Sequence, residues 1–267
     1  MIAAATAEAP PARARRVVLG CPLDALTLAQ VVDAVDSAID AGAPCRHIAM
    51  NAAKLVRLQH DPVLAEAVAG SELVTADGQS VVWAARVLGQ RVPERVAGID
   101  LMMALLARAE QAGYGVYVLG ARPEVLERAL QRMRELHPRL RIVGAQHGYF
   151  APETEWEVVE RIHTSASQLL FVALETPAKE LFLARNHERL GVPFVMGVGG
   201  SIDILAGVRK RAPRVLQRLG LEWLYRLSQD PRRLARRYVV GNTVFAWLVL
   251  RALIRRGPGR MEAAASS

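Results

Sequence analysis

Residues 115–144 read GVYVLGARPEVLERALQRMRELHPRLRIVG, and they decide the fold class. The apolar run Gly115–Leu119 is typical of a buried strand, Gly120 turns the chain, and Pro123 opens a helical pattern. Arg141–Gly144 predicts the following strand. A strand, a helix and a second strand of these lengths form one right-handed βαβ unit, so the two strands are parallel.

Strand-like runs alternate with helical patterns on both sides of this unit. The alternation predicts an α/β domain over residues 17–207, a Rossmann-like parallel sheet flanked by helices. From residue 208 to 257 the pattern is helical only, and we predict a basic, membrane-associating appendage. Residues 1–16 and 258–267 are expected to be disordered. The other strand-like runs are Val17–Leu19, His47–Met50, Leu73–Thr75, Leu169–Leu174 and Pro193–Val198.

The positive charge is concentrated near the carboxyl end of the chain. The 267 residues carry a formal net charge of +8, with 34 Lys and Arg against 26 Asp and Glu. Between Arg209 and Arg260 stand 14 of the basic and 2 of the acidic residues, which leaves 20 and 24 for the rest. This basic tail is therefore expected to meet an anionic partner: substrate phosphates, acidic lipid headgroups or nucleic acid.

Tyr238–Leu250 is an uncharged run of 13 residues in the basic tail. It is shorter than the roughly 20 apolar residues with which a helix spans a bilayer. Because arginines stand at both ends, we predict a helix lying on a membrane surface; a core helix with charged ends is the alternative. Nucleic-acid binding is disfavoured, because aromatic residues make up only 5% of the chain and no reader motif is present.

Residues 193–203, PFVMGVGGSID, end a buried strand in a pair of glycines. Gly199 and Gly200 let the backbone bend and approach a ligand closely, and Asp203 follows as an acceptor. A diphosphate suits this strand end, because bare backbone N–H groups would meet it on one side and arginines of the basic tail on the other.

Further polar candidates stand at the ends of other predicted strands, where ligands of a doubly wound sheet bind. They are Asn51, Asp77, Gly120 and Glu175. Asp77 precedes a glycine, so it is either half of an ordinary turn or a carboxylate able to take a proton from a hydroxyl. Gly120 is not part of a G-x-G-x-x-G motif, and a plain turn explains it as well.

The residue types that bind metals are scattered. Six histidines and two cysteines show no H-x-x-x-H, H-E-x-x-H or C-x-x-C spacing, and no D-x-D occurs. We therefore expect no metal site. The two cysteines form no disulfide framework, which fits a reducing cytosol.

A series of short motifs runs from about Val17 to Tyr238. They are Leu19-Gly20 with Pro22, Asn51, Ala76-Asp77-Gly78, Glu94-Arg95-Val96 with Gly98-Ile99-Asp100, Leu119-Gly120, Gly148-Tyr149-Phe150, Gly197–Gly200 with Asp203 and Gly207, Arg211-Ala212-Pro213, and Gly220–Trp223 with Tyr225-Arg226. In order and number they resemble the bacterial WecG/TagA/CpsF glycosyltransferases. These enzymes transfer N-acetylmannosamine-type sugars from UDP to polyprenyl-diphosphate-linked acceptors for cell-wall and surface polysaccharides.

The resemblance implies an inverting, metal-independent transfer without a cofactor, by a peripheral protein on the cytoplasmic face of the inner membrane. It implies that Asp77 is the catalytic base and that Arg95 binds substrate beside it. The implied partners are a UDP-sugar, the lipid-linked acceptor and an anionic membrane surface, not nucleic acid; a homo-oligomer is left open. Gly120 and Asp203 would lie at the uridine and ribose. The implied substrate-binding residues are Asn51, Gly120, Lys179, Gly199, Gly200, Asp203, Arg226, Arg233 and Arg236, the three arginines closing over the diphosphate from the appendage.

Two motifs depart from the family pattern beside the reacting sugar. The family's T-x-N is Ala49-Met50-Asn51 here, so the hydroxyl is missing. Its G-x-G-x-P-K-Q-E is ALETPAKE at residues 173–180, with Lys179 in place of the glutamine. Glu175 adds a carboxylate at a strand end, and Lys179 either pairs with it or contacts an altered sugar or phosphate. The alternative function is therefore a catalytically altered member that binds nucleotide sugar or scaffolds polysaccharide assembly.

Overall fold

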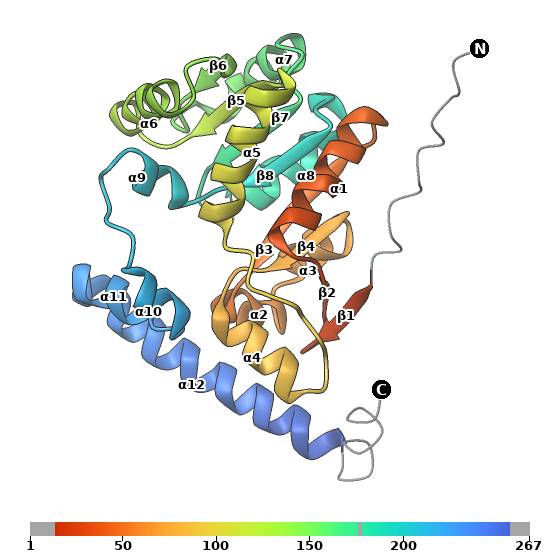
Figure 1. Cartoon of the computed structure of the whole chain (residues 1–267), viewed down its shortest axis with the longest axis vertical. Helices are drawn as coiled ribbons and strands as arrows, with labels where there is room; N and C mark the ends of the chain where they lie inside the picture. Colours follow the sequence, from red (N-terminus) through yellow and green to blue (C-terminus); the bar gives the residue numbers. More distant parts are fainter. Residues whose placement is uncertain (1–13, 176–177, 257–267) are drawn as a thin grey trace.

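The computed structural model describes residues 14–175 and 178–256, with the backbone alone at residues 218 and 233–238. A six-stranded parallel sheet lies at its centre in the order β4-β3-β8-β7-β5-β6 (Figure 1). Its strands are β3 Cys45–Met50, β4 Leu73–Ala76, β5 Gly115–Gly120, β6 Arg141–Gln146, β7 Leu169–Ala173 and β8 Phe194–Gly197. The predicted Rossmann-like α/β fold is confirmed, and β5 and β6 form the expected parallel pair.

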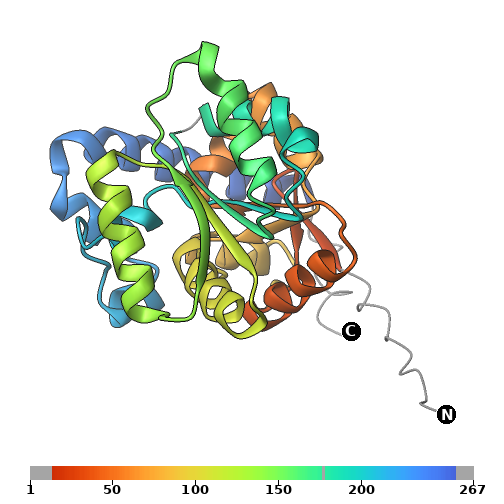
Figure 2. The same ribbon diagram turned by 90° about the horizontal axis from the view of Figure 1, so that it is seen from above.

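Helices cover both faces of the sheet (Figure 2). Against one face pack α1 Leu28–Asp40, α5 Gly98–Ala112, α6 Pro123–Leu136 and α9 Ser201–Leu205. Against the other pack α2 Ala52–Leu58, α3 Pro62–Ala69, α4 Gln79–Val87, α7 Glu155–Thr164 and α8 Ala178–Leu190, with the 3-10 turn Pro152–Thr154 before α7. The loops at the carboxyl ends of the strands are therefore held between two rigid layers.

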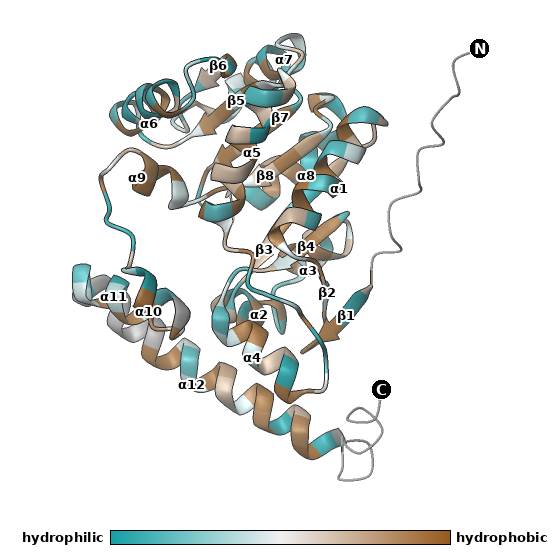
Figure 3. Ribbon diagram, viewed as in Figure 1, coloured by the Kyte–Doolittle hydropathy of each residue, from teal (hydrophilic) through white to brown (hydrophobic). Residues whose placement is uncertain are grey.

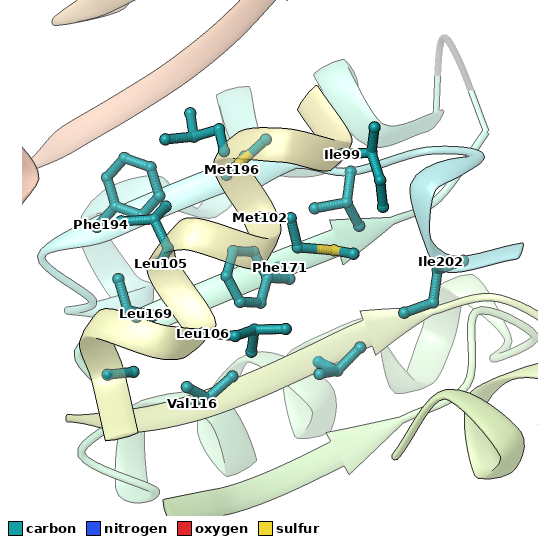
Figure 4. Packing of buried hydrophobic residues seen from close by; sticks show 14 of the residues in the cluster. Ile99, Met102, Leu105, Leu106, Val116, Leu169, Phe171, Phe194, Met196 and Ile202 are labelled. Atoms are coloured by element: carbon teal, nitrogen blue, oxygen red, sulfur yellow. The ribbon is translucent and has the colours of Figure 1, made fainter. Parts of the chain in front are cut away.

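Alternation along the strands divides the core between these faces. In β5, Val116 and Val118 point into the cluster under α5, whereas Tyr117 and Leu119 point to the opposite face. Figure 4 shows the first cluster, where Phe171 lies among the α5 side chains. Every residue of β5 is buried, as expected for a strand of a parallel sheet covered on both sides.

An antiparallel hairpin precedes the sheet and was only half predicted. It joins β1 Arg15–Val18 to β2 Cys21–Asp24 through Leu19 and Gly20, which both have positive φ. The sequence analysis placed one strand here, at Val17–Leu19. The second strand was missed because it is four residues long and contains Pro22, which removes a ladder donor.

The carboxyl-terminal helices are α10 Arg214–Arg218, α11 Glu222–Gln229 and α12 Pro231–Arg256. In Figure 1, α12 lies along α2 and α4 at the edge of the domain, and it packs against α2. Phe245 is buried in the cluster beneath it, while Val240, Trp247 and Ile254 are exposed. Across the described residues, no helix is both long and apolar enough to cross a membrane. The predicted domain boundaries, at residues 17, 207 and 257, stay predictions.

Candidate functional site

The direction of the strand connections reverses between β5 and β7. The chain leaves β5 toward β6 on one side and leaves β7 toward β8 on the other, and such a reversal marks where α/β proteins bind ligands. Gly120 ends β5 at φ 118°, and a Cβ there would lie 2.5 Å from the Ala173 carbonyl carbon. The glycine is thus required by the close approach of two strand ends.

Asp77 follows β4 and is held from two directions by backbone. Its N–H donates to the Met50 carbonyl at 2.8 Å, and its Oδ1 accepts from the Gly98 N–H at 2.9 Å. Gly98 is the first residue of α5, so the carboxylate lies at the positive end of a 15-residue helix. The predicted strand-end carboxylate is therefore fixed in place and half-buried. Asp77 thus makes contacts beyond those of an ordinary Asp-Gly turn.

Asn51 is bound to its own helix. As the N-cap of α2, its Oδ1 accepts from the Lys54 N–H at 3.1 Å. Its position at the end of β3 is as predicted, and capping accounts for the side-chain oxygen.

Lys54 is a residue that sequence reasoning missed. Its ammonium turns back to donate to the Ala49 carbonyl at 3.1 Å, at the end of β3. Burial first, and then the charge of Lys179, lower its pKa from 10.5 to about 8. A lysine in the first turn of a helix is opposed by the helix dipole, and this misplacement was the available signal.

Lys179 lies against the end of β8, close enough to Lys54 for the two charges to act on each other. Lys179 is only 8% exposed, its methylenes lie against Gly197, and its Nζ is 3.3 Å from Glu180 Oε1. The ion pair in the structure is thus with Glu180, whereas Glu175 contributes a backbone carbonyl that accepts from the Lys179 N–H.

The glycine pair after β8 leads into α9. Gly199 has φ 46°, and Gly200 is the N-cap of α9. Asp203 lies on α9, and its Oδ2 is 3.8 Å from Arg209 Nε. The Asp203 carbonyl also accepts from the Val208 and Arg209 N–H groups. The start of the basic tail is therefore folded back onto Asp203.

Arg95 joins the α/β domain to the appendage and is not a surface arginine. Its side chain is 14% exposed, and it donates to Glu222 at 2.9 Å and to Gln217 at 3.3 Å. The other oxygen of Glu222 accepts from Arg226 at 3.0 Å, so one carboxylate holds Arg95 and Arg226 together. Arg233 and Arg236 belong to α12, and their side chains lie outside the described residues.

Asp77 and Arg95 are brought together by one loop. The Val96 N–H donates to the Ala76 carbonyl at 2.9 Å, which binds the 95–98 segment to the end of β4. Asp100, two residues further, holds Arg211 of the appendage through two hydrogen bonds of 2.6 and 2.7 Å. Sequence reasoning had quoted Asp100, Arg211 and Glu222 as motif positions without giving them a role. Their opposite charges in neighbouring motifs were the available signal.

Metal-binding side chains do not gather in the part of the chain that the structure describes. No group of three or more His, Cys, Asp or Glu there could hold a metal ion. The charged groups at the carboxyl edge include the carboxylates of Asp77 and Glu180 and the ammonium groups of Lys54 and Lys179.

The family model that matches this chain carries the description glycosyl transferase WecG/TagA/CpsF family, and the match runs over residues 16–258. It therefore includes the hairpin from Arg16 onward, the whole six-stranded sheet and the helices α10, α11 and α12.

Proposed function

Because the chain belongs to the WecG/TagA/CpsF family, it is a glycosyltransferase of cell-surface polysaccharide synthesis, and we propose the following reaction. A sugar moves from a UDP-sugar to a saccharide linked to polyprenyl diphosphate, with inversion. The observation that supports the proposal is the 95–98 segment, which begins at Arg95 and is bound to the Asp77 carboxylate and to the end of β4.

In this mechanism Asp77 acts as general base. It takes the proton from an acceptor hydroxyl as the hydroxyl oxygen attacks the anomeric carbon. The bond between that carbon and the UDP oxygen breaks in the same displacement, which inverts the configuration. The hydrogen bond from the Gly98 N–H leaves Oδ2 for the proton, since no described residue bonds to that oxygen.

The departing UDP gains negative charge, and guanidinium groups are suited to it because they donate two parallel hydrogen bonds to phosphate oxygens. We assign this role to Arg226 with Arg233 and Arg236, and the uridine to the edge near Gly120 and Asp203. Gly199 and Gly200 would offer backbone N–H groups to the diphosphate. No metal and no cofactor takes part in the proposed reaction.

The appendage would bring the enzyme to its lipid-linked acceptor. Val240, Trp247 and Ile254 recur every seven residues on the exposed side of α12, and Arg251 lies over the Trp247 ring at 5.1 Å. Figure 3 shows apolar residues along the carboxyl-terminal half of this helix. Apolar side chains rimmed by arginine suit an anionic membrane surface, which we propose is the cytoplasmic face of the inner membrane.

A second candidate is a relative that binds nucleotide sugar without transferring it. It is favoured by Lys179, because a buried ammonium paired with Glu180 replaces the family's amide beside the sugar. Ala49 removes a hydroxyl from the same region. Binding of UDP with no turnover over a panel of donors would establish this candidate.

The test is a screen of UDP-sugars with a short-chain polyprenyl-diphosphate sugar as acceptor, measuring UDP release and acceptor mass. Transfer from at least one donor, with UDP released in equal amount, is expected. A K179Q variant tests the sugar contact, because restoring the amide should change the ranking of donors. Absence of both UDP binding and turnover in the wild type would refute the proposed function.

A further inference from the structure

A cleft of about 440 Å³ lies between the α/β domain and α10. Its walls are Gln79, Glu94, Arg95, Asp100, Arg211, Arg214 and Gln217. Gly220 at the end of α10 lies against the Trp83 ring, which holds α10 beside α4. The cleft is lined from both sides of the junction, by Arg95 and Asp100 of the α/β domain and by Arg214 and Gln217 of α10.

Some of the charged side chains that line the cleft have hydrogen-bond partners, and one has none among the described residues. Glu94 accepts from the Leu28 N–H at the start of α1, and Asp100 is held by both terminal nitrogens of Arg211. Arg214 is exposed, and no described residue makes a hydrogen bond or ion pair with its guanidinium. The cleft therefore offers one cation whose charge is not neutralised within the described chain.

The cleft is close enough to Asp77 for one substrate to reach both. The Asp77 carboxylate accepts from the Gly98 N–H, and Asp100 in the cleft wall is two residues further along the chain. The Cα atoms of Gly98 and Asp100 are therefore at most about 7.6 Å apart. An acceptor sugar whose hydroxyl meets Asp77 would thus place its anomeric diphosphate one ring away, toward the cleft.

Apolar side chains continue from the cleft onto the surface. On α10, Arg214 and Gln217 line the cleft, while Val215 and Leu219 lie one turn apart on another face and are 66% and 54% exposed. A cation with an adjoining apolar strip matches an amphiphile whose charged group and hydrocarbon chain are directly linked.

We infer that this cleft binds the diphosphate of the polyprenyl-linked acceptor, with Arg214 as its donor and the first isoprene units against Val215 and Leu219. The inference rests on the proposed function and adds a second anion site, separate from the one for UDP. Arg95 lies at the boundary of the two sites, since it lines the cleft and belongs to the same loop as the Asp77 contact.

The test is isothermal titration of the full chain with farnesyl diphosphate, inorganic pyrophosphate and UDP. The variants are R214Q, V215N and the control R189Q, an exposed arginine at the far end of α8. R214Q should lower the affinity for farnesyl diphosphate and pyrophosphate about tenfold, because one charged hydrogen bond is lost, and should leave the affinity for UDP unchanged. V215N should lower the affinity for farnesyl diphosphate alone, and R189Q should leave all three affinities unchanged.

An equal loss of UDP and farnesyl diphosphate affinity in R214Q would overturn the inference, because the cleft would then belong to the donor. Unchanged farnesyl diphosphate binding in both R214Q and V215N, or none in the wild type, would also overturn it. Failure of the proposed function is separate, since it appears as loss of UDP binding in the wild type. Melting curves of each variant exclude misfolding as the cause.

Discussion

The carboxyl edge of the sheet and the junction with the appendage hold their charged groups by different means. At the edge, Asp77 is fixed by the Gly98 N–H and Lys54 by the Ala49 carbonyl, so the fold itself places these groups. At the junction, Arg95 and Arg226 are placed by the Glu222 carboxylate, side chain against side chain.

This difference separates chemistry from docking. Groups bound to backbone stay in place as long as the sheet is folded, which is what a reacting carboxylate needs. Ion pairs between side chains that solvent reaches in part, such as Arg226 with Glu222, are weakened by salt and exchangeable for another anion. Changes at the edge should therefore alter turnover or folding strongly, and changes at the junction should first alter how firmly the appendage is held, and through it the arginines proposed to bind UDP.

The largest effect is expected from D77N. The amide keeps an oxygen for the Gly98 N–H but cannot take a proton, so turnover should fall by roughly 10²–10⁴ while UDP affinity is retained. Initial rates of UDP release and UDP titrations measure this. D33N, an exposed aspartate on α1, is the control and should react as the wild type. Wild-type turnover in D77N would remove Asp77 as the base.

The edge also predicts a pH dependence of stability through Lys54. The unfolded chain keeps this proton up to about pH 10.5 and the folded chain only to about 8, because burial and Lys179 lower the pKa. The unfolded state thus binds more protons between these values, so wild-type stability should rise with pH there. The charged groups that act on Lys54 are Lys179, Glu180, Asp77 and Arg57.

K54M removes this titration, and urea unfolding at pH 7, 8, 9 and 10 measures the result. The free energy of unfolding of K54M should exceed that of the wild type by most at pH 7, and this difference should shrink as the pH rises through 8. K210M is the matched control, because Lys210 is exposed. Parallel pH profiles for K54M and the wild type would show that Lys54 titrates as a solvated lysine.

The fold was predictable because its signals are local. The run Gly115–Leu119, the turn at Gly120 and the helix after Pro123 each follow from a few adjacent residues, and the βαβ geometry follows from them. The strand containing Pro22 was not predictable in this way. Its stability comes from pairing with β1 and from the Asp24 carboxylate, which accepts from the Val74 N–H fifty residues away.

The site was predictable only in part, for the same reason. Asp77 and Gly120 stand at strand ends, and this placement follows once the strands are known. The hydrogen-bond partners of Arg95, Glu222 and Gln217, are over 120 residues away in sequence, so these contacts depend on how the appendage packs. Lys54 required knowing that its side chain folds back from α2 onto β3.

At the junction, E222Q tests whether the ion pairs hold the appendage. The amide removes the charge shared by Arg95 and Arg226, and we expect docking to weaken by about 1–2 kcal/mol. Hydrogen exchange of α10 and α11 should speed up while the strands of the sheet stay protected. In 1 M salt the wild type should approach the variant. E188Q, whose side chain is 89% exposed, is the control and should change neither.

The smallest effect on folding is expected from W247S on α12. Trp247 is 54% exposed, so the free energy of unfolding should change by less than about 0.5 kcal/mol. Its ring would be buried only against a bilayer, and losing a burial of about 1.5 kcal/mol should weaken partition onto anionic vesicles about tenfold. W156S is the matched control, because Trp156 on α7 is 58% exposed and outside the appendage. Equal vesicle binding by W247S, W156S and the wild type would mean that the exposed side of α12 faces something other than lipid. The appendage would then differ from the edge of the sheet only in how it is held to the α/β domain.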